Sequence, residues 1–116
     1  MQDKTVDEMI KIIKDALKRH FGNRITSGFT ITDVNEDVNH KEFSIQVTLY
    51  DYYRIYINYD KFIGACIATG DVGVGLKNSQ NDWSQDDFDI DLFMEEMKKE
   101  IELRIPDKYL KAKGWL

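Results

Sequence analysis

The chain has 116 residues, with 21 acidic and 16 basic side chains, a net charge of -5, one Cys and one Pro. Its apolar share of 42% is ordinary for a folded domain, and the composition excludes collagen-like, low-complexity and disulfide-framework proteins. We expect a single domain over residues 1–116, because two domains of half this length would each bury too little apolar surface.

The first predicted element is a helix over residues 5–21. Thr5 and Glu8 have the spacing of a capping box, in which each side chain satisfies a backbone amide of the other residue. Apolar residues then recur at helical spacing, and Gly22 is suited to end the helix. The members of this apolar stripe are Val6, Met9, Ile10, Ile13, Ala16, Leu17 and Phe21.

From Ile25 the apolar pattern changes to a period of two, which is typical of strands with one buried face. We expect a twisted edge segment that ends near Val34, followed by a polar loop over residues 35–40. Two alternating strands should follow over 43–50 and 52–59, with a tight turn near Asp51. Residues 62–69 are mostly apolar and predict a central strand that lies near both layers, and residues 72–76 predict a fifth strand.

Residues 77–84 are polar and predict a loop, after which apolar residues return at helical spacing from Ile90 to Ile105. Asp89 or Asp91 is the expected N-cap of this second helix. Pro106 ends it and suits the start of a short third helix, residues 107–113, that is closed by Gly114. The predicted fold class is therefore α+β: an N-terminal helix, a four- to five-stranded antiparallel meander sheet, a C-terminal helix and a short third helix.

The compartment signals favour a cytoplasmic protein. The N-terminus is charged and leads directly into the first helix, so no secretory signal is expected. The longest run of apolar or glycine residues, 62–68, is far shorter than a membrane span. Cys66 is the only Cys, so no intrachain disulfide can form.

The sequence contains parts of two ligand-binding motifs, one for phosphate and one for calcium, but neither motif is complete. The glycines of the segment Gly70–Lys77 resemble a phosphate loop, but Leu76 stands where that motif requires Lys. Asp87, Asp89 and Asp91 have the spacing of half a calcium loop, whose later Gly and Glu are absent. A glycine-bearing strand and helix-start acids are the simpler interpretations.

No catalytic residue, metal site or cofactor is expected from the remaining reactive side chains. His20, His40 and Cys66 share no short ligand spacing, so they could hold zinc only if distant elements brought them together. Cys66 stands in an apolar strand and is expected to be an inert core residue.

If the apolar residues of the two alternating strands face the helices, four residues share the opposite face: Tyr50, Tyr52, Arg54 and Tyr56. Such aromatic residues can stack nucleobases, but a negative net charge opposes direct binding of nucleic acid. Tyr and Arg are also favoured anchors in protein interfaces, and a dimer partner could cover this face.

The most unusual feature is an acidic stretch, residues 82–102, where nine acidic residues stand against Lys98 and Lys99. A solvated helix face is the ordinary explanation of such a stretch. A dense acidic surface can also attract a basic protein and compete for a groove that binds nucleic acid.

The segment Trp83-Ser84-Gln85-Asp86-Asp87, placed before an acidic helix, resembles small phage-borne inhibitor proteins. Some anti-CRISPR proteins of this kind mimic DNA with clusters of acidic residues. The resemblance implies an inhibitor from a phage or mobile element that acts on a nucleic-acid-handling machine.

The leading hypothesis is accordingly a non-enzymatic acidic protein that binds a basic protein partner. Its expected interface consists of acids on and before the second helix, Trp83 and the exposed face of the sheet: Trp83, Asp86, Asp87, Asp89, Asp91, Glu95, Glu96, Tyr52, Arg54 and Tyr56. Two alternatives stay open. One is a small-molecule-binding or catalytic domain with a pocket between helix and sheet near Gly70–Gly75, and the other is a structural homo-oligomer built through the tyrosine face.

Overall fold

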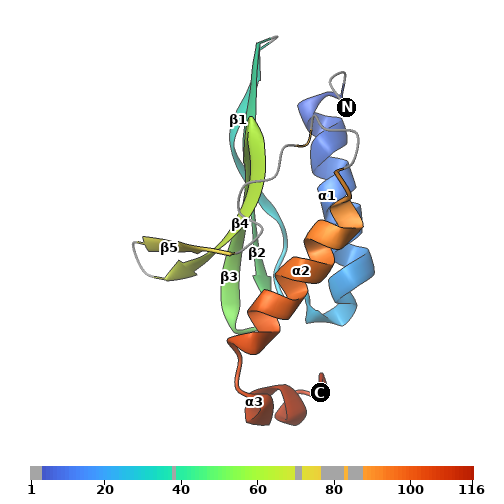
Figure 1. The fold of residues 1–116 in the computed structure, drawn as a ribbon, viewed down its shortest axis with the longest axis vertical. Helices are drawn as coiled ribbons and strands as arrows, with labels where there is room; N and C mark the ends of the chain where they lie inside the picture. The colour runs from blue at the N-terminus through green and yellow to red at the C-terminus, as the bar shows by residue number, and fades with distance from the viewer. Residues whose placement is uncertain (1–3, 38, 70–71, 77–82, 84–87) are drawn as a thin grey trace.

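Two long helices cover one face of a five-stranded antiparallel sheet, and a third, short helix lies beyond one end of the sheet (Figure 1). The computed structural model describes residues 4–37, 39–69, 72–76, 83 and 88–116. The predicted α+β fold is confirmed. In chain order the elements are α1 (Val6–Phe21), the 3₁₀ turn η1 (Gly22–Arg24), β1 (Thr30–Asp37), β2 (His40–Leu49), β3 (Tyr53–Asp60), β4 (Phe62–Thr69), β5 (Val72–Gly75), α2 (Ile90–Leu103) and α3 (Asp107–Ala112).

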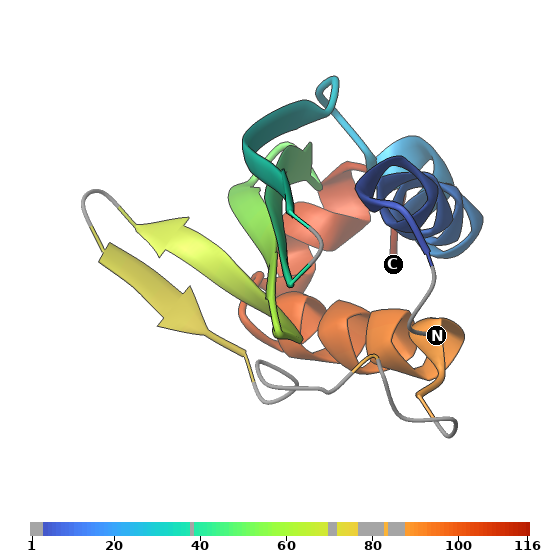
Figure 2. The same ribbon diagram turned by 90° about the horizontal axis from the view of Figure 1, so that it is seen from above.

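The sheet is a simple meander, because each strand pairs antiparallel with its neighbour in the chain, in the order β1-β2-β3-β4-β5. Alternate residues of the inner strands are buried under α1 and α2, which lie on the same side of the sheet (Figure 2). In β2 the buried residues are Phe43, Ile45, Val47 and Leu49. The other face of the strands carries no described helix, and we call it the open face.

The start of α1 is held both locally and by a distant strand. Thr5 Oγ1 accepts a hydrogen bond from Glu8 N at 3.1 Å, and Glu8 Oε1 accepts one from Thr5 N at 3.0 Å, so the predicted capping box is confirmed. The carboxylate of Glu36, on β1, accepts a further hydrogen bond from Val6 N at 3.0 Å. A helix leaves its first amides without partners inside the helix, and here β1 supplies one of the acceptors.

The ends of the other helices also follow the expected signals. Asp89 is the N-cap of α2, and its side chain accepts hydrogen bonds from Asp91 N and Leu92 N. Pro106 precedes α3, and Gly114 follows it with a positive φ of 79°, which glycine adopts without strain.

The expected polar loop over residues 35–40 is wrong, because strands β1 and β2 continue through most of it. A β-bulge at Asp33, where φ is 57°, shifts the register between the pairs Thr32↔Ser44 and Asn35↔Glu42. The bulge breaks the alternation that identifies a strand in a sequence, so a polar edge strand has the composition of a loop.

The turn between β2 and β3 lies where the sequence predicts it, but it buries a residue expected on the open face. Tyr50 and Asp51 both have positive φ, 60° and 49°, and Tyr52 N donates to Leu49 O. This backbone removes Tyr50 from the alternation, and its side chain is fully buried in the core. Its hydroxyl donates to the carboxylate of Glu102 on α2.

Strand β4 is covered by helices on one face only, which corrects the expectation that it lies near both layers. Ile63, Ala65 and Ile67 are buried against the helices. On the open face Phe62 is exposed, although Gly64 is buried within the sheet and Cys66 is half-buried. Among the described residues, no helix is long and apolar enough to cross a membrane.

Substitution to Ala on the two faces of β2 should have very different effects on stability. Ile45→Ala removes a fully buried side chain and should lower the free energy of unfolding by about 2–5 kcal/mol. Gln46→Ala, on the open face, should change it by less than about 0.5 kcal/mol. Urea unfolding monitored by circular dichroism measures both values, and equal losses would contradict the one-sided burial.

Candidate functional site

The acids of α2 are divided between internal contacts and solvent. Asp91 Oδ1 lies 2.8 Å from Arg19 Nη2 and 2.8 Å from His20 Nε2, both near the C-terminal end of α1. The hydrogen bond from Arg19, followed by that from His20, holds the pKa of the Asp91 carboxyl below its usual value. The charge of Asp91 therefore joins the two long helices and is partly neutralised there.

Two further acids of the predicted acidic stretch also have partners within the protein, one at the end of the same helix and one in the turn between β2 and β3. Glu100 is buried and pairs with Arg104, with 2.6 Å between Oε2 and Nη1. Glu102 accepts the hydrogen bond from the Tyr50 hydroxyl. The acidic surface is thus smaller than the sequence alone indicates.

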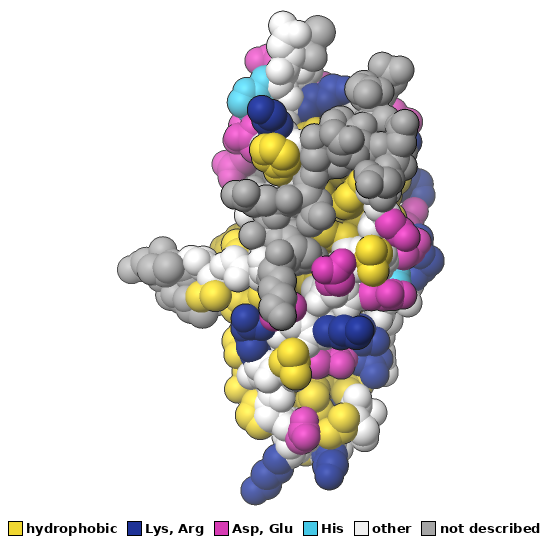
Figure 3. Space-filling model, viewed as in Figure 1, with side chains coloured by type: hydrophobic (Ala, Val, Ile, Leu, Met, Phe, Trp, Pro, Cys, Tyr) yellow, Lys and Arg dark blue, Asp and Glu magenta, His cyan; other side chains and the backbone are white. Residues whose placement is uncertain are grey.

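The remaining described acids of α2 are exposed. Asp89 caps the helix, and neither Glu95 nor Glu96 has an ion-pair partner among the described residues. Asp86 and Asp87, which the sequence analysis included in the interface, lie outside the described residues. Figure 3 shows acidic side chains interspersed with basic ones over the region where Figure 1 places α2.

Exposed leucines lie on the same side of α2 as these carboxylates. Leu92 is 51% exposed and Leu103 is 83% exposed, although both belong to the helix that supplies Phe93 and Met94 to the core. Helical spacing places them on one arc, which we call the outer α2 face: Leu92, Glu95, Glu96, Lys99 and Leu103. A hollow of about 380 Å³ adjoins its C-terminal end and is lined by Lys99, Glu102, Leu103, Ile105, Asp107, Leu110 and Leu116.

Trp83 is not an exposed anchor, and that expectation is corrected. It is only 3% exposed and belongs to the hydrophobic core. Its ring contacts those of Tyr59 and Phe88, with centroids 6.2 Å and 5.5 Å apart. The polar residues next to Trp83 do not indicate this burial, which depends on Tyr59 of β3 and on Phe88 in the segment before α2.

The predicted tyrosine face is divided by the turn. Tyr50 is buried, and Tyr52 makes edge contacts with Tyr53 and Tyr109, near α3. Arg54 and Tyr56 do lie on the open face, where Tyr56 is opposite Gln46 and Cys66. An extended aromatic surface of the kind that stacks several bases is therefore not assembled by these residues.

The glycine segment forms a strand, as the simpler interpretation predicted, and it borders a hollow on the open face. Val72–Gly75 pairs with β4, and a Cβ atom at Gly73 would lie 3.3 Å from Cys66 Sγ. Gly70 and Asp71 lie outside the described residues. The hollow has a volume of about 260 Å³ and is lined by Asn58, Asp60, Phe62, Gly64, Ala65, Cys66 and Gly75.

This hollow differs from the pocket considered from the sequence, because it does not lie between a helix and the sheet. Its volume is also below the range of roughly 300–1,000 Å³ that is usual for small-molecule sites. Burial raises the pKa of the Cys66 thiol, which is opposite to the change that makes a thiol a nucleophile.

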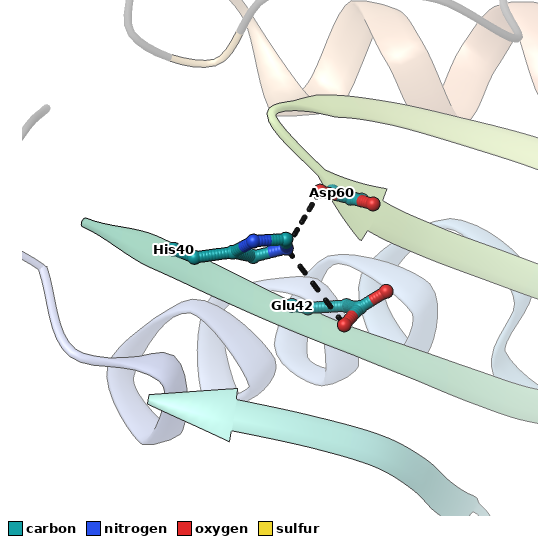
Figure 4. A group of neighbouring side chains, drawn as sticks. All are labelled: His40, Glu42 and Asp60. Atoms are coloured by element: carbon teal, nitrogen blue, oxygen red, sulfur yellow. Dashed lines mark ion pairs between the residues drawn. The ribbon is translucent and has the colours of Figure 1, made fainter. Parts of the chain in front are cut away.

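One cluster of metal-binding residue types was missed in the sequence. His40 and Glu42 on β2 and Asp60 on β3 converge at one end of the open face (Figure 4). His40 Nε2 lies 3.0 Å from Asp60 Oδ1 and 3.8 Å from Glu42 Oε1. The sequence could have indicated this cluster. Glu42 and Asp60 are equally far from the turn residue Asp51, so a hairpin places them opposite each other, and His40 is two residues from Glu42 on the same face.

The three reactive side chains considered from the sequence do not meet. His20 contacts Asp91, His40 contacts Asp60, and Cys66 accepts a long hydrogen bond from Asn58. The neighbours of His40 are therefore carboxylates, and neither the second imidazole nor the thiol lies beside it.

The Asp91 contacts predict an acid-dependent part of the stability. The pKa of Asp91 is lowered in the folded state, so its stabilising contribution is present above the unfolded value of about 3.9 and is lost as the pH falls through the folded value. Wild type should therefore be more stable than Asp91→Asn at pH 6, and this difference should shrink steadily below about pH 4. Urea unfolding across this range measures the difference, and a gap that stays constant with pH would contradict the pairing.

Comparison of the chain with protein-family models, with curated proteins and with solved structures found no match. The function must therefore be inferred from the surfaces and side-chain clusters of the molecule itself.

Proposed function

We propose that this chain is a non-enzymatic binding protein that engages a basic protein partner through the outer α2 face. The observation that carries the proposal is the combination, on one exposed helix face, of two leucines with two carboxylates that have no ion-pair partner among the described residues.

The leucines supply the apolar part of such an interface. The inner face of α2 already provides the buried apolar residues of the helix, Phe93, Met94, Met97 and Ile101. Leu92 and Leu103 face the other way and add little to the core. A partner that covered them would gain apolar burial, and the hollow beside Leu103 offers space for one of its side chains. The leucines thus take the anchoring role that the sequence analysis assigned to Trp83.

The carboxylates supply the attraction to a basic surface. Glu95 and Glu96 lie between the two leucines in the chain, Asp89 is exposed at the start of the helix, and the whole chain has a net charge of -5. Glu95 and Glu96 outnumber Lys99 on the outer α2 face, and an excess of exposed charge of one sign accelerates encounter with a surface of the opposite sign. Proteins that handle nucleic acid present basic grooves, so we propose an inhibitor of such a protein, acting in the cytoplasm, where the thiol of Cys66 would stay reduced.

Charge reversal on the outer α2 face tests this function. Wild type, the double variant Glu95→Lys/Glu96→Lys and the control Asp7→Lys/Asp15→Lys are each immobilised and exposed to the same bacterial lysate. The control makes the same change in net charge on α1, away from the proposed interface. One basic protein should bind to wild type and to the control and should be reduced at least tenfold on the α2 variant. Equal capture by all three, or loss from both variants, would overturn the proposal.

Substitution of one exposed leucine distinguishes the contribution of apolar burial to binding from that of electrostatic attraction. Leu103→Ala should speed dissociation of the captured partner, whereas Glu95→Lys/Glu96→Lys should mainly slow association and weaken its dependence on salt. Surface plasmon resonance at low and high salt measures both rates. Dissociation unchanged in Leu103→Ala would show that the leucine lies outside the interface.

A further inference from the structure

The cluster of His40, Glu42 and Asp60 is positioned by the backbone of two paired strands. His40 and Glu42 are two residues apart on β2, so their side chains project from the same face. Asp60, at the end of β3, is the register partner of Glu42. Figure 4 shows the His40 ring directed between the two carboxylates. The pairing of β2 with β3 therefore holds the Cα atoms of the three residues at neighbouring positions on one face of the sheet.

The distances are close to the spacing of ligands around one small ion. The three ligand atoms all lie within 4.8 Å of one another, and the imidazole nitrogen is 3.0 Å and 3.8 Å from the two carboxylate oxygens. Atoms bound tetrahedrally to Zn²⁺ at about 2.0–2.2 Å lie roughly 3.3–3.6 Å apart. Small rotations of the side chains would bring the set to this spacing, and all three side chains are exposed enough to rotate.

The donor set also indicates which kind of ion would bind. One imidazole nitrogen with two carboxylate oxygens suits Zn²⁺ and other late first-row divalent ions, whereas Mg²⁺ and Ca²⁺ prefer oxygen donors alone. The two carboxylates approach each other across the strand pair, and a divalent cation would offset their repulsion. A protonated His40 can do so with one positive charge only.

We propose that His40, Glu42 and Asp60 form a binding site for a single divalent transition-metal ion, with Zn²⁺ as its representative. Three protein ligands leave at least one coordination position open to water or to a donor atom from another molecule. Asp60 also lines the hollow of about 260 Å³ on the open face, so the ion would lie beside this hollow. The site is independent of the outer α2 face, and either proposal can fail without the other.

Calorimetric titration with ZnCl₂ tests the site on untagged, chelator-treated protein at pH 7. Wild type should bind one equivalent of Zn²⁺. His40→Asn and Asp60→Asn should each lose at least tenfold in affinity, and His20→Asn, which removes the only other imidazole, should bind as wild type does. Circular dichroism confirms that each variant is folded. Absence of Zn²⁺ binding by wild type at millimolar concentration, or unchanged affinity in His40→Asn, would overturn the proposal.

The ring signals of the two histidines and the choice of ion give a second readout. In proton NMR, the ring signals of His40 should move on addition of Zn²⁺ while those of His20 stay in place. Mg²⁺ at the same concentration should leave both unchanged. Ring signals of His40 that do not respond to Zn²⁺ would contradict direct ligation.

Discussion

The alternation of apolar and polar residues along β2 and β3 is the constraint on which the rest of the molecule depends. Because successive side chains of a strand point to opposite faces, this pattern gives the sheet one apolar face, and α1 and α2 both pack on it. The polar positions of the same strands then lie together on the other face. His40, Glu42 and Asp60 are close to one another for this reason, although no feature of the core requires them to be.

The register that aligns those positions is set by a turn with an unusual sequence. Two consecutive residues with positive φ favour Asn and Gly, yet this turn has Tyr50 and Asp51. Contacts from three other parts of the chain hold it. Arg24 O accepts from Tyr50 N, the Tyr109 hydroxyl donates to Tyr50 O, and Glu102 accepts from the Tyr50 hydroxyl. The strain of a bulky residue in the left-handed region is thus offset by tertiary hydrogen bonds.

Those features of the fold that depend on neighbours in the chain could be predicted from the sequence. The capping box at Thr5 and Glu8, the cap at Asp89 and the alternation of Phe43 to Leu49 are local signals, and the structure contains all of them. The contact of Trp83 with Tyr59 and the internal pairing of Asp91 could not be predicted, because each partner is separated from its residue in the chain by at least one complete element.

Contacts between distant parts of the chain also decide which residues of the candidate sites are available. The net charge of residues 82–102 suggests a fully solvated acidic surface, whereas the fold pairs Asp91 with α1 and Glu102 with the hydroxyl of Tyr50. Glu100 is also paired, with Arg104 four residues further along the chain. The exposure of Leu92 and Leu103 depends on which arc of α2 faces the core. The His40 cluster was within reach of sequence analysis, since it requires only the turn at Asp51 and the pairing that this turn implies.

The bulge at Asp33 has a consequence for how copies of this protein meet one another. β1 is an edge of the sheet, and a regular edge offers its free amides and carbonyls to a strand from another molecule. The left-handed residue interrupts that row, and the acids that follow it, Glu36 and Asp37, would face the same charges on an approaching copy. At the opposite edge, β5 is only four residues long. Both ends of the sheet therefore oppose open-ended polymerisation, and the protein can expose one whole face of its sheet without assembling into fibres.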